Sequence, residues 1–204
     1  MTTFIKICGL TDEAAVQAAV NAGADAVGFV FAESSRRVTP QHAATIAANV
    51  PQHIKRVAVM LHPSGDEWRE VAEVFQPDVL QTDAADFASL DVAGDIERWP
   101  VFREGAASMA EETPQTFVYE GQKSGRGEKV DWTIAADLAK RGRMILAGGL
   151  SAGNVADAIA TVAPYGVDVS SAIESAPGRK DAAKIKTFID AVRITNNLDK
   201  ETRR

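Results

Sequence analysis

The stretch Phe4-Ile5-Lys6-Ile7-Cys8-Gly9-Leu10-Thr11-Asp12-Glu13 contains the unit that the rest of the chain repeats. Its first five residues form a short, largely apolar run typical of a buried β-strand, and the run stops at Gly9. Thr11, followed by two acidic residues, has the features of a helix cap with an acidic first turn. We therefore interpret this stretch as a strand followed by a helix.

The same succession returns along the whole chain, where short apolar runs alternate with helix candidates of about 8 to 15 residues. Eight strands are predicted, at residues 4–8, 26–31, 56–61, 79–82, 101–103, 116–119, 144–147 and 166–169. Eight parallel units in 204 residues favour a single closed (β/α)₈ TIM barrel. A doubly wound open sheet is the competing architecture, since it shows the same alternation.

Capping residues indicate where several of the helices begin. Thr39 is expected to be an N-cap, with Pro40 at the first helical position, where the missing N–H costs nothing. Ser64 and Glu67 have the spacing of a capping box. These signals predict helices that begin near residues 40 and 65.

No linker rich in Pro, Gly or Ser divides the chain, so we expect residues 1–204 to form one domain. Asp181 is expected to cap a last helix that runs to about residue 192. The polar residues 196–204 are expected to form a disordered tail.

Composition argues against several classes of protein. Hydrophobic residues make up 46% of the chain, and no apolar run approaches the roughly 20 residues that span a bilayer. The net charge of −6 argues against a nucleic-acid surface, although it leaves room for a local basic pocket. The first residues show no basic leader and no apolar signal segment. We expect a soluble, cytoplasmic protein with no membrane or nucleic-acid partner.

The one cysteine, Cys8, excludes an internal disulfide framework and a cysteine-rich zinc site. The histidines lack metal-ligand spacing, so we expect no metal site and assign no role to His42, His53 or His62. Cys8 is therefore either a small buried filler or a reactive thiol.

Strand ends are the positions to inspect in a closed barrel, because active sites lie at the carboxyl ends of the strands. Side-chain alternation places Lys6 and Cys8 on the inner face of the first strand, and the same parity places Asp168 inward on the eighth. The charge of Lys6 would favour the Cys8 thiolate. An ion pair between Lys6 and Asp168 is expected beneath the site, and a direct role in substrate binding is an equal alternative for Asp168.

Two further strand ends are suited to anions. Gly148-Gly149 follows the seventh strand and Ser170-Ser171 the eighth, which are the places where these barrels commonly hold a phosphate through backbone N–H groups. A Gly-Gly pair alone would indicate only a tight turn. Arg36 and Arg37 follow the second strand, where one guanidinium of the pair can bind a carboxylate through two parallel hydrogen bonds.

Several of these motifs, taken together, resemble the phosphoribosylanthranilate isomerase family. The similarity runs from end to end and is weaker over residues 76–114. The matching stretches are Lys6-Ile7-Cys8-Gly9-Leu10-Thr11, Gly23 to Phe31 with Ser35-Arg36-Arg37 and Pro40, Gly127 with Val130-Asp131-Trp132, Ala147-Gly148-Gly149-Leu150 with Asn154-Val155, Val167 to Glu174, and Pro177 to Asp181.

The resemblance implies a barrel enzyme that rearranges N-(5'-phosphoribosyl)anthranilate in tryptophan biosynthesis without a cofactor. It gives the role of general base to Cys8, the anthranilate carboxylate to Arg37, and a place near the substrate to Asp168. Lys6 is expected beside them in the substrate site. The phosphate would be held through backbone groups of Gly148, Gly149, Ser170, Ser171 and Ala172.

The chain departs from the family pattern at three positions. Glu120 stands where the family usually has an aspartate as general acid, and its chemistry is the same with one more methylene. Asp83 stands in place of the usual histidine after the fourth strand and is expected among the substrate-binding residues, and beside Glu120 it would raise the pKa of that acid. Ala172 replaces a glycine, which matters only if the residue needs positive φ.

Two other functions remain open at this point. A related phosphosugar isomerase barrel of histidine biosynthesis would use two catalytic aspartates, and Cys8 stands in the first of those places. A family member that has lost catalysis would bind a phosphometabolite only. The expected partner is a small phosphosugar, and the expected assembly is a monomer or weak homodimer.

Overall fold

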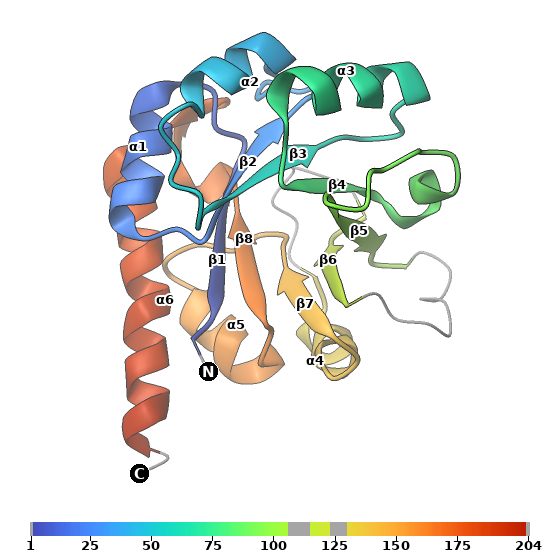
Figure 1. Ribbon diagram of the computed structural model, residues 1–204. Helices are drawn as coiled ribbons and strands as arrows, with labels where there is room; N and C mark the ends of the chain where they lie inside the picture. The colour runs from blue at the N-terminus through green and yellow to red at the C-terminus, as the bar shows by residue number, and fades with distance from the viewer. Residues whose placement is uncertain (1, 106–114, 123–129, 203–204) are drawn as a thin grey trace.

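The computed structural model describes residues 2–105, 115–122 and 130–202, and its centre is a closed barrel of parallel strands (Figure 1). The strands follow chain order around the barrel, and β1 pairs with β8 to close it. They are β1 (Phe4–Cys8), β2 (Ala26–Val30), β3 (Lys55–Val59), β4 (Val79–Asp83), β5 (Glu97–Arg103), β6 (Thr116–Glu120), β7 (Arg143–Leu146) and β8 (Gly166–Val169). The predicted (β/α)₈ barrel is confirmed, because in an open sheet β1 and β8 would not pair with each other.

Helices cover the outside of the barrel (Figure 1). They are α1 (Glu13–Ala22), α2 (Pro40–Ile46), α3 (Gly65–Phe75), α4 (Trp132–Ala139), α5 (Val155–Val162) and α6 (Ala182–Thr202). A short 3₁₀ turn, η1 (Ala84–Ala88), follows β4, and η2 (Ser171–Ile173) follows β8. A hairpin of β9 (Glu174–Ala176) and β10 (Arg179–Lys180) precedes α6.

Gly127 of the family-like motifs lies outside the described residues. No helix among the described residues has the length and apolar character needed to cross a membrane.

Two of the three caps predicted from the sequence in the first half of the chain are confirmed. The Thr39 side chain accepts a hydrogen bond from His42 N, and Ser64 with Glu67 forms a reciprocal capping box. The cap of α1 is Asp12 rather than Thr11, since its carboxylate accepts from Ala15 N at 2.8 Å. The Thr11 hydroxyl instead donates to the carbonyl of Gly178, which is distant in sequence.

The last helix is longer than the sequence indicated. Asp181 caps it as expected, accepting from two backbone N–H groups of the first turn. The helix then continues to Thr202 instead of ending near Val192. Asn196, the first residue of the expected tail, is buried, and its side-chain oxygen accepts from the Thr3 hydroxyl at 2.8 Å. The disordered tail therefore does not begin there, because this polar side chain pairs with the residue that precedes β1.

Apolar side chains fill two layers, one between strands and helices and one inside the barrel. Ile5 and Ile7 belong to the outer layer, as their parity predicted. The inner layer contains Ala26, Val57, Val79, Trp99, Val101, Val118, Ile145 and Ala147. Trp99 is almost fully buried and meets the ring of Phe4 edge-on. The barrel is therefore a packed core below its carboxyl-terminal mouth, where the inward residues become polar.

Candidate active site

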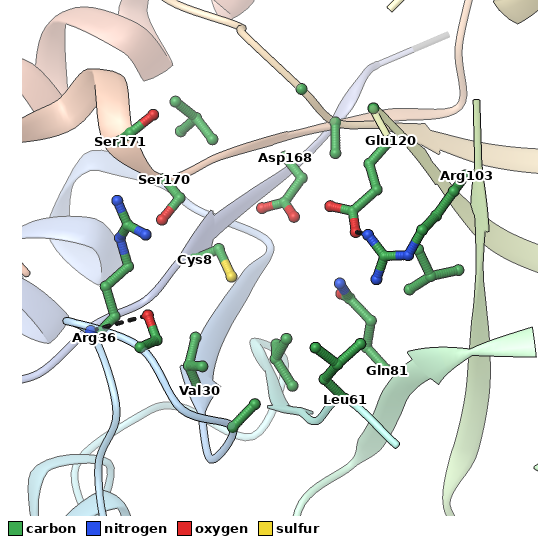
Figure 2. A pocket seen from close by; sticks show the side chains of 18 of the residues that line it. Cys8, Val30, Arg36, Leu61, Gln81, Arg103, Glu120, Asp168, Ser170 and Ser171 are labelled. Carbon is green, nitrogen blue, oxygen red and sulfur yellow. Dashed lines mark hydrogen bonds and ion pairs between the residues drawn. The ribbon is translucent and has the colours of Figure 1, made fainter. Parts of the chain in front are cut away.

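A cavity opens at the carboxyl end of the barrel, and side chains from nearly all of the strand ends line it (Figure 2). Cys8 and Glu120, the two expected catalytic residues, both face this cavity, as do Asp168, Gly148, Gly149, Ser170 and Ser171. The structure thus brings together most of the residues that the sequence singled out. Lys6 lies just beneath the cavity, and Arg37, Asp83 and Ala172 do not line it.

Cys8 lies at the end of β1 and is buried, with 7% of its surface exposed. Burial raises the pKa of its thiol, and the nearby charge and hydrogen bond of Lys6 offset that rise only in part. The expected direction of the Lys6 effect is therefore correct, but burial outweighs it. Gly28 on β2 makes room for this arrangement, because a Cβ there would lie 3.1 Å from Cys8 Sγ and 3.3 Å from Lys6 Nζ.

The expected ion pair beneath the site is present. Lys6 Nζ donates to Asp168 Oδ2 at 2.7 Å, with the lysine side chain fully buried. Burial alone would lower the pKa of Lys6, but the charge and hydrogen bond of Asp168 outweigh it and raise that pKa. Asp168 Oδ1 has no hydrogen-bond partner among the described residues. One carboxylate oxygen therefore holds the lysine, and the other is left for a ligand in the cavity that Asp168 lines.

The ends of β7 and β8 form one wall of the cavity. Gly148 and Gly149 have φ values of 93° and 62°, which favour glycine over residues with side chains. Asn154 fixes their loop by donating to Gly149 O at 2.9 Å and accepting from Ser151 N at 2.8 Å. Ala172 does not have positive φ, so replacing a glycine there causes no backbone strain. This wall consists of small residues that line the cavity, and their backbone N–H groups are suited to an anion.

The two arginines after β2 lie in different places. Arg36 lines the cavity on the side of Ser170 and Ser171 (Figure 2). Arg37 lines a separate surface pocket beside Thr39 and Glu67. The assignment of the substrate carboxylate to Arg37 therefore has no support from its position. The sequence left the pair ambiguous because an irregular loop has no periodicity from which the direction of a side chain follows.

A buried lysine, Lys180, connects Arg36 to the wall formed by the ends of β7 and β8. Arg36 binds Glu174 through two contacts, Nε to Oε1 at 2.6 Å and Nη2 to Oε2 at 3.0 Å. Lys180 donates to the same Glu174 at 2.9 Å and to the carbonyl of Ser170 at 2.9 Å. One connected network thus positions the Arg36 side chain and Ser170 at the cavity, and it consists of Arg36, Glu174, Lys180 and Ser170.

Opposite this wall, charged side chains from three neighbouring strand ends contact one another, and two of them, Glu120 and Arg103, line the cavity. Glu120 on β6 accepts from Arg103 Nη1 at 2.5 Å, and Asp83 on β4 accepts from Arg103 Nη2 at 2.6 Å and Nε at 3.2 Å. Asp83 was expected directly beside Glu120, but Arg103 of β5 lies between them. The like-charge contact that the sequence suggested is therefore replaced by a shared guanidinium. Arg103 was missed, although it is the last inward residue of the fifth strand.

Gln81 was also not predicted as a site residue. Its side chain is buried, and in Figure 2 its amide points into the cavity between Cys8 and Arg103. The amide oxygen has no hydrogen-bond partner among the described residues. A buried polar group without a partner is costly, so this amide is suited to a ligand hydroxyl. The sequence signal was its inward parity, two residues before Asp83.

Comparison with known proteins agrees with this geometry. A family model described as N-(5'phosphoribosyl)anthranilate (PRA) isomerase matches residues 5–191. The N-(5'-phosphoribosyl)anthranilate isomerase of Streptococcus gordonii is 39% identical over 195 residues, which cover 94% of this chain and 98% of the relative. TrpF from Jonesia denitrificans superposes with a TM-score of 0.80 at 36% identity, covering 95% and 98% of the two chains. A phosphoribosyl anthranilate isomerase in complex with reduced 1-(o-carboxyphenylamino)-1-deoxyribulose 5-phosphate gives a TM-score of 0.77 at 28% identity, covering 94% and 98%.

Proposed function

Because this chain belongs to the N-(5'-phosphoribosyl)anthranilate isomerase family, we propose that it converts N-(5'-phosphoribosyl)anthranilate into 1-(2-carboxyphenylamino)-1-deoxyribulose 5-phosphate, with Cys8 as general base and Glu120 as general acid. The chain is an isomerase, and its family acts in tryptophan biosynthesis. The observation that supports the proposed chemistry is that the Cys8 thiol and the Glu120 carboxyl face one cavity from different strands. A rearrangement that removes one proton and adds another needs this pairing.

Glu120 and Cys8 would carry two of the proton transfers in the proposed reaction. Glu120 gives its proton to the furanose oxygen while the bond from that oxygen to C1 breaks, which leaves an open-chain protonated Schiff base. The Cys8 thiolate then removes the proton from C2, and the resulting enolamine becomes the ketone product when C1 gains a proton and the C2 hydroxyl loses one. The raised pKa of Cys8 reduces the fraction of thiolate, but it makes each thiolate a stronger base. Lys6 lies close enough to stabilise the thiolate charge.

The proposed substrate has two anionic ends, and the cavity has two suited regions. Backbone groups at Gly148, Gly149, Ser170 and Ser171 would hold the phosphate. Arg36, rather than Arg37, would bind the anthranilate carboxylate, since Arg36 lines the cavity. Asp168 would contact the sugar through Oδ1, to which no described residue donates a hydrogen bond.

The test is the loss of anthranilate fluorescence when phosphoribosylanthranilate is supplied to wild type, Cys8→Ala and Glu120→Gln. We expect turnover by wild type and a fall of about 10²-fold or more in each variant, which is the contribution of a positioned acid or base. An inactive wild type would refute the function and leave a phosphometabolite-binding protein. A fully active Glu120→Gln would refute only the acid assignment.

The assembly and location stay predictions. We propose a monomer or weak homodimer in the cytoplasm. Light scattering over a range of concentrations tests the assembly, and a single mass independent of concentration at twice the chain mass would contradict it.

A further inference from the structure

Lys180 is a buried lysine that contacts the loop after β8. It is the last residue of β10, and its side chain is fully buried. Its Nζ lies 2.9 Å from the carbonyl oxygen of Ser170, 3.2 Å from Ser170 Oγ and 2.9 Å from Glu174 Oε1. An ammonium group has three hydrogens to donate and no acceptor, so the three oxygens match its three donors.

An ion pair keeps the amine of Lys180 charged. Burial lowers the pKa of Lys180, and the hydrogen bond and charge of Glu174 oppose that shift. Burial alone would raise the pKa of Glu174, but the hydrogen bonds from Arg36 and Lys180 outweigh it and lower that pKa. Glu174 is therefore an ionised partner, and a buried lysine beside an ionised carboxylate keeps its proton.

The bond from Lys180 decides what the Ser170 hydroxyl can do. Ser170 stands at the N-cap of η2, where a serine oxygen usually accepts from a helix N–H, but its side chain makes no such bond. Its Oγ accepts from Lys180 instead. An ammonium cannot accept in return, and no described residue accepts a hydrogen bond from this hydroxyl. Its hydrogen is therefore available to a ligand.

The surroundings of Ser170 leave the cavity as the open side of its hydroxyl. Lys180 lies on one side, and Gly9 closes another, because a Cβ on Gly9 would lie 3.1 Å from Ser170 Oγ. Ser170 itself lines the cavity, and Figure 2 shows its side chain between Arg36 and Asp168. A ligand in the cavity is thus the acceptor that this hydroxyl can reach.

The hairpin of β9 and β10 holds Lys180 in place. Its turn packs against the loop after β2, since a Cβ on Gly178 would overlap the carbonyl oxygen of Ser35. The Thr11 hydroxyl, from the loop after β1, donates to the carbonyl of Gly178 at 2.9 Å. Lys180 therefore extends from a backbone that two other loops fix, as a positioning group requires.

We propose that Lys180 is a positioning residue for the substrate phosphate, which, by donating to both oxygens of Ser170, turns the Ser170 hydroxyl into a hydrogen-bond donor toward that phosphate. This inference rests on the proposed function, because it needs a phosphosugar in the cavity. The loop after the eighth strand is where these barrels commonly hold a phosphate, and a phosphate dianion offers only acceptor oxygens. The hydroxyl adds a side-chain contact to the backbone groups at Gly148 and Gly149.

The experiment compares two forms of one ligand. The probes are reduced 1-(o-carboxyphenylamino)-1-deoxyribulose 5-phosphate, which a solved relative binds, and the same molecule after a phosphatase has removed its phosphate. Fluorescence of the anthranilate group reports the binding of each form. The ratio of the two dissociation constants isolates the contribution of the phosphate contacts from that of the rest of the ligand.

We expect this ratio to fall by about tenfold in Lys180→Met and in Ser170→Ala, the size of one hydrogen bond to a charged group. The matched control is Lys184→Met, which should keep the wild-type ratio. Lys184 is exposed, donates to the carbonyl of Glu174 at 2.7 Å and does not line the cavity. In turnover, Lys180→Met should raise KM and leave kcat little changed, because the phosphate is bound alike in the ground and transition states.

The double variant tests whether Lys180 acts through the hydroxyl. Its ratio should fall little further than in either single variant, because Ser170→Ala removes the group that the lysine positions. Additive losses, an unchanged ratio in Lys180→Met, or equal weakening of both ligand forms would overturn the inference. If Lys180→Met does not fold, Ser170→Ala decides alone, and an unchanged ratio there overturns it.

Failure of the proposed function would look different. Wild type would then bind the phosphorylated and the dephosphorylated ligand equally, which would refute the phosphate region of the cavity and this inference with it. A wild type that prefers the phosphorylated form by a margin that Lys180→Met does not change would refute the role of Lys180 alone.

Discussion

Breaking the Lys6 and Asp168 ion pair should strongly destabilise the protein. The lysine side chain is 0% exposed, the aspartate side chain is 8% exposed, and Nζ lies 2.7 Å from Oδ2. Lys6→Met would remove the hydrogen bond to Asp168 Oδ2, and Asp168 Oδ1 already has no partner among the described residues. Neither carboxylate oxygen would then accept a hydrogen bond from a described residue. Removing one member of a buried pair costs about 3–5 kcal/mol.

The double-mutant cycle makes this magnitude testable. We expect Lys6→Met and Asp168→Leu each to cost about 3–5 kcal/mol, and the double variant to cost less than about 2 kcal/mol, because two apolar groups restore a neutral core. In urea, each single variant should lower the unfolding midpoint by about 1.5 M at the slopes usual for proteins. The control cycle is Lys55 with Glu97, a pair of similar length at 2.6 Å that is 36% and 43% exposed. That pair should contribute no more than about 1 kcal/mol.

Additive losses in the Lys6 and Asp168 cycle would refute this reasoning, as would a cost below about 1 kcal/mol for Lys6→Met. Either result would mean that the two charges are solvated or neutral in the folded protein. Circular dichroism of each variant would show whether the barrel itself is retained.

Three further predictions concern the cavity. Arg36→Met should lower kcat/KM by about 10²-fold, since a charged hydrogen-bonded contact contributes about 1.5–3 kcal/mol. Arg37→Met should keep kcat/KM within about twofold of wild type. If Arg37→Met instead causes the larger loss, the anthranilate carboxylate binds Arg37. Gln81→Leu should raise KM by about tenfold without loss of stability, because the amide oxygen has no partner to lose among the described residues, and urea unfolding with steady-state kinetics separates the two effects. For Cys8, burial raises the pKa of the folded thiol, so the thiolate absorbance should appear only above the ordinary pKa of about 8.5. The thiol of the unfolded protein ionises near that ordinary pKa, at lower pH than the folded thiol. The contribution of this thiol to stability is therefore complete below the ordinary pKa and declines as pH rises through the folded pKa. A thiolate signal at neutral pH would contradict this.

Much of the site could be predicted because strands have a strict period of two. That period placed Lys6, Cys8 and Asp168 inside the barrel, and closure then brought the first and eighth strands together. The Gly148-Gly149 and Ser170-Ser171 pairs line the cavity because they follow strands directly. Glu120 lines the cavity for a similar reason, because it is the last residue of β6.

The features that local patterns did not fix share a different cause. The direction of Arg36 and Arg37 depends on an irregular loop, and the true cap of α1 depends on Thr11 being bound by Gly178, which is far away in sequence. The length of α6 depends likewise on Asn196 pairing with Thr3. Each of these outcomes is set by tertiary contacts that no local pattern encodes.

The sequence by itself determined the strand and helix order, the inward and outward faces of the strands and the family to which the chain belongs. These follow from local periodicity, capping and motifs that adjacent residues carry. Only the tertiary structure decided that Arg103 lies between Asp83 and Glu120, that Lys180 joins Arg36 to Ser170, and that burial outweighs Lys6 at the Cys8 thiol. Those outcomes depend on register between strands and on exclusion of water, which exist only once the barrel has closed.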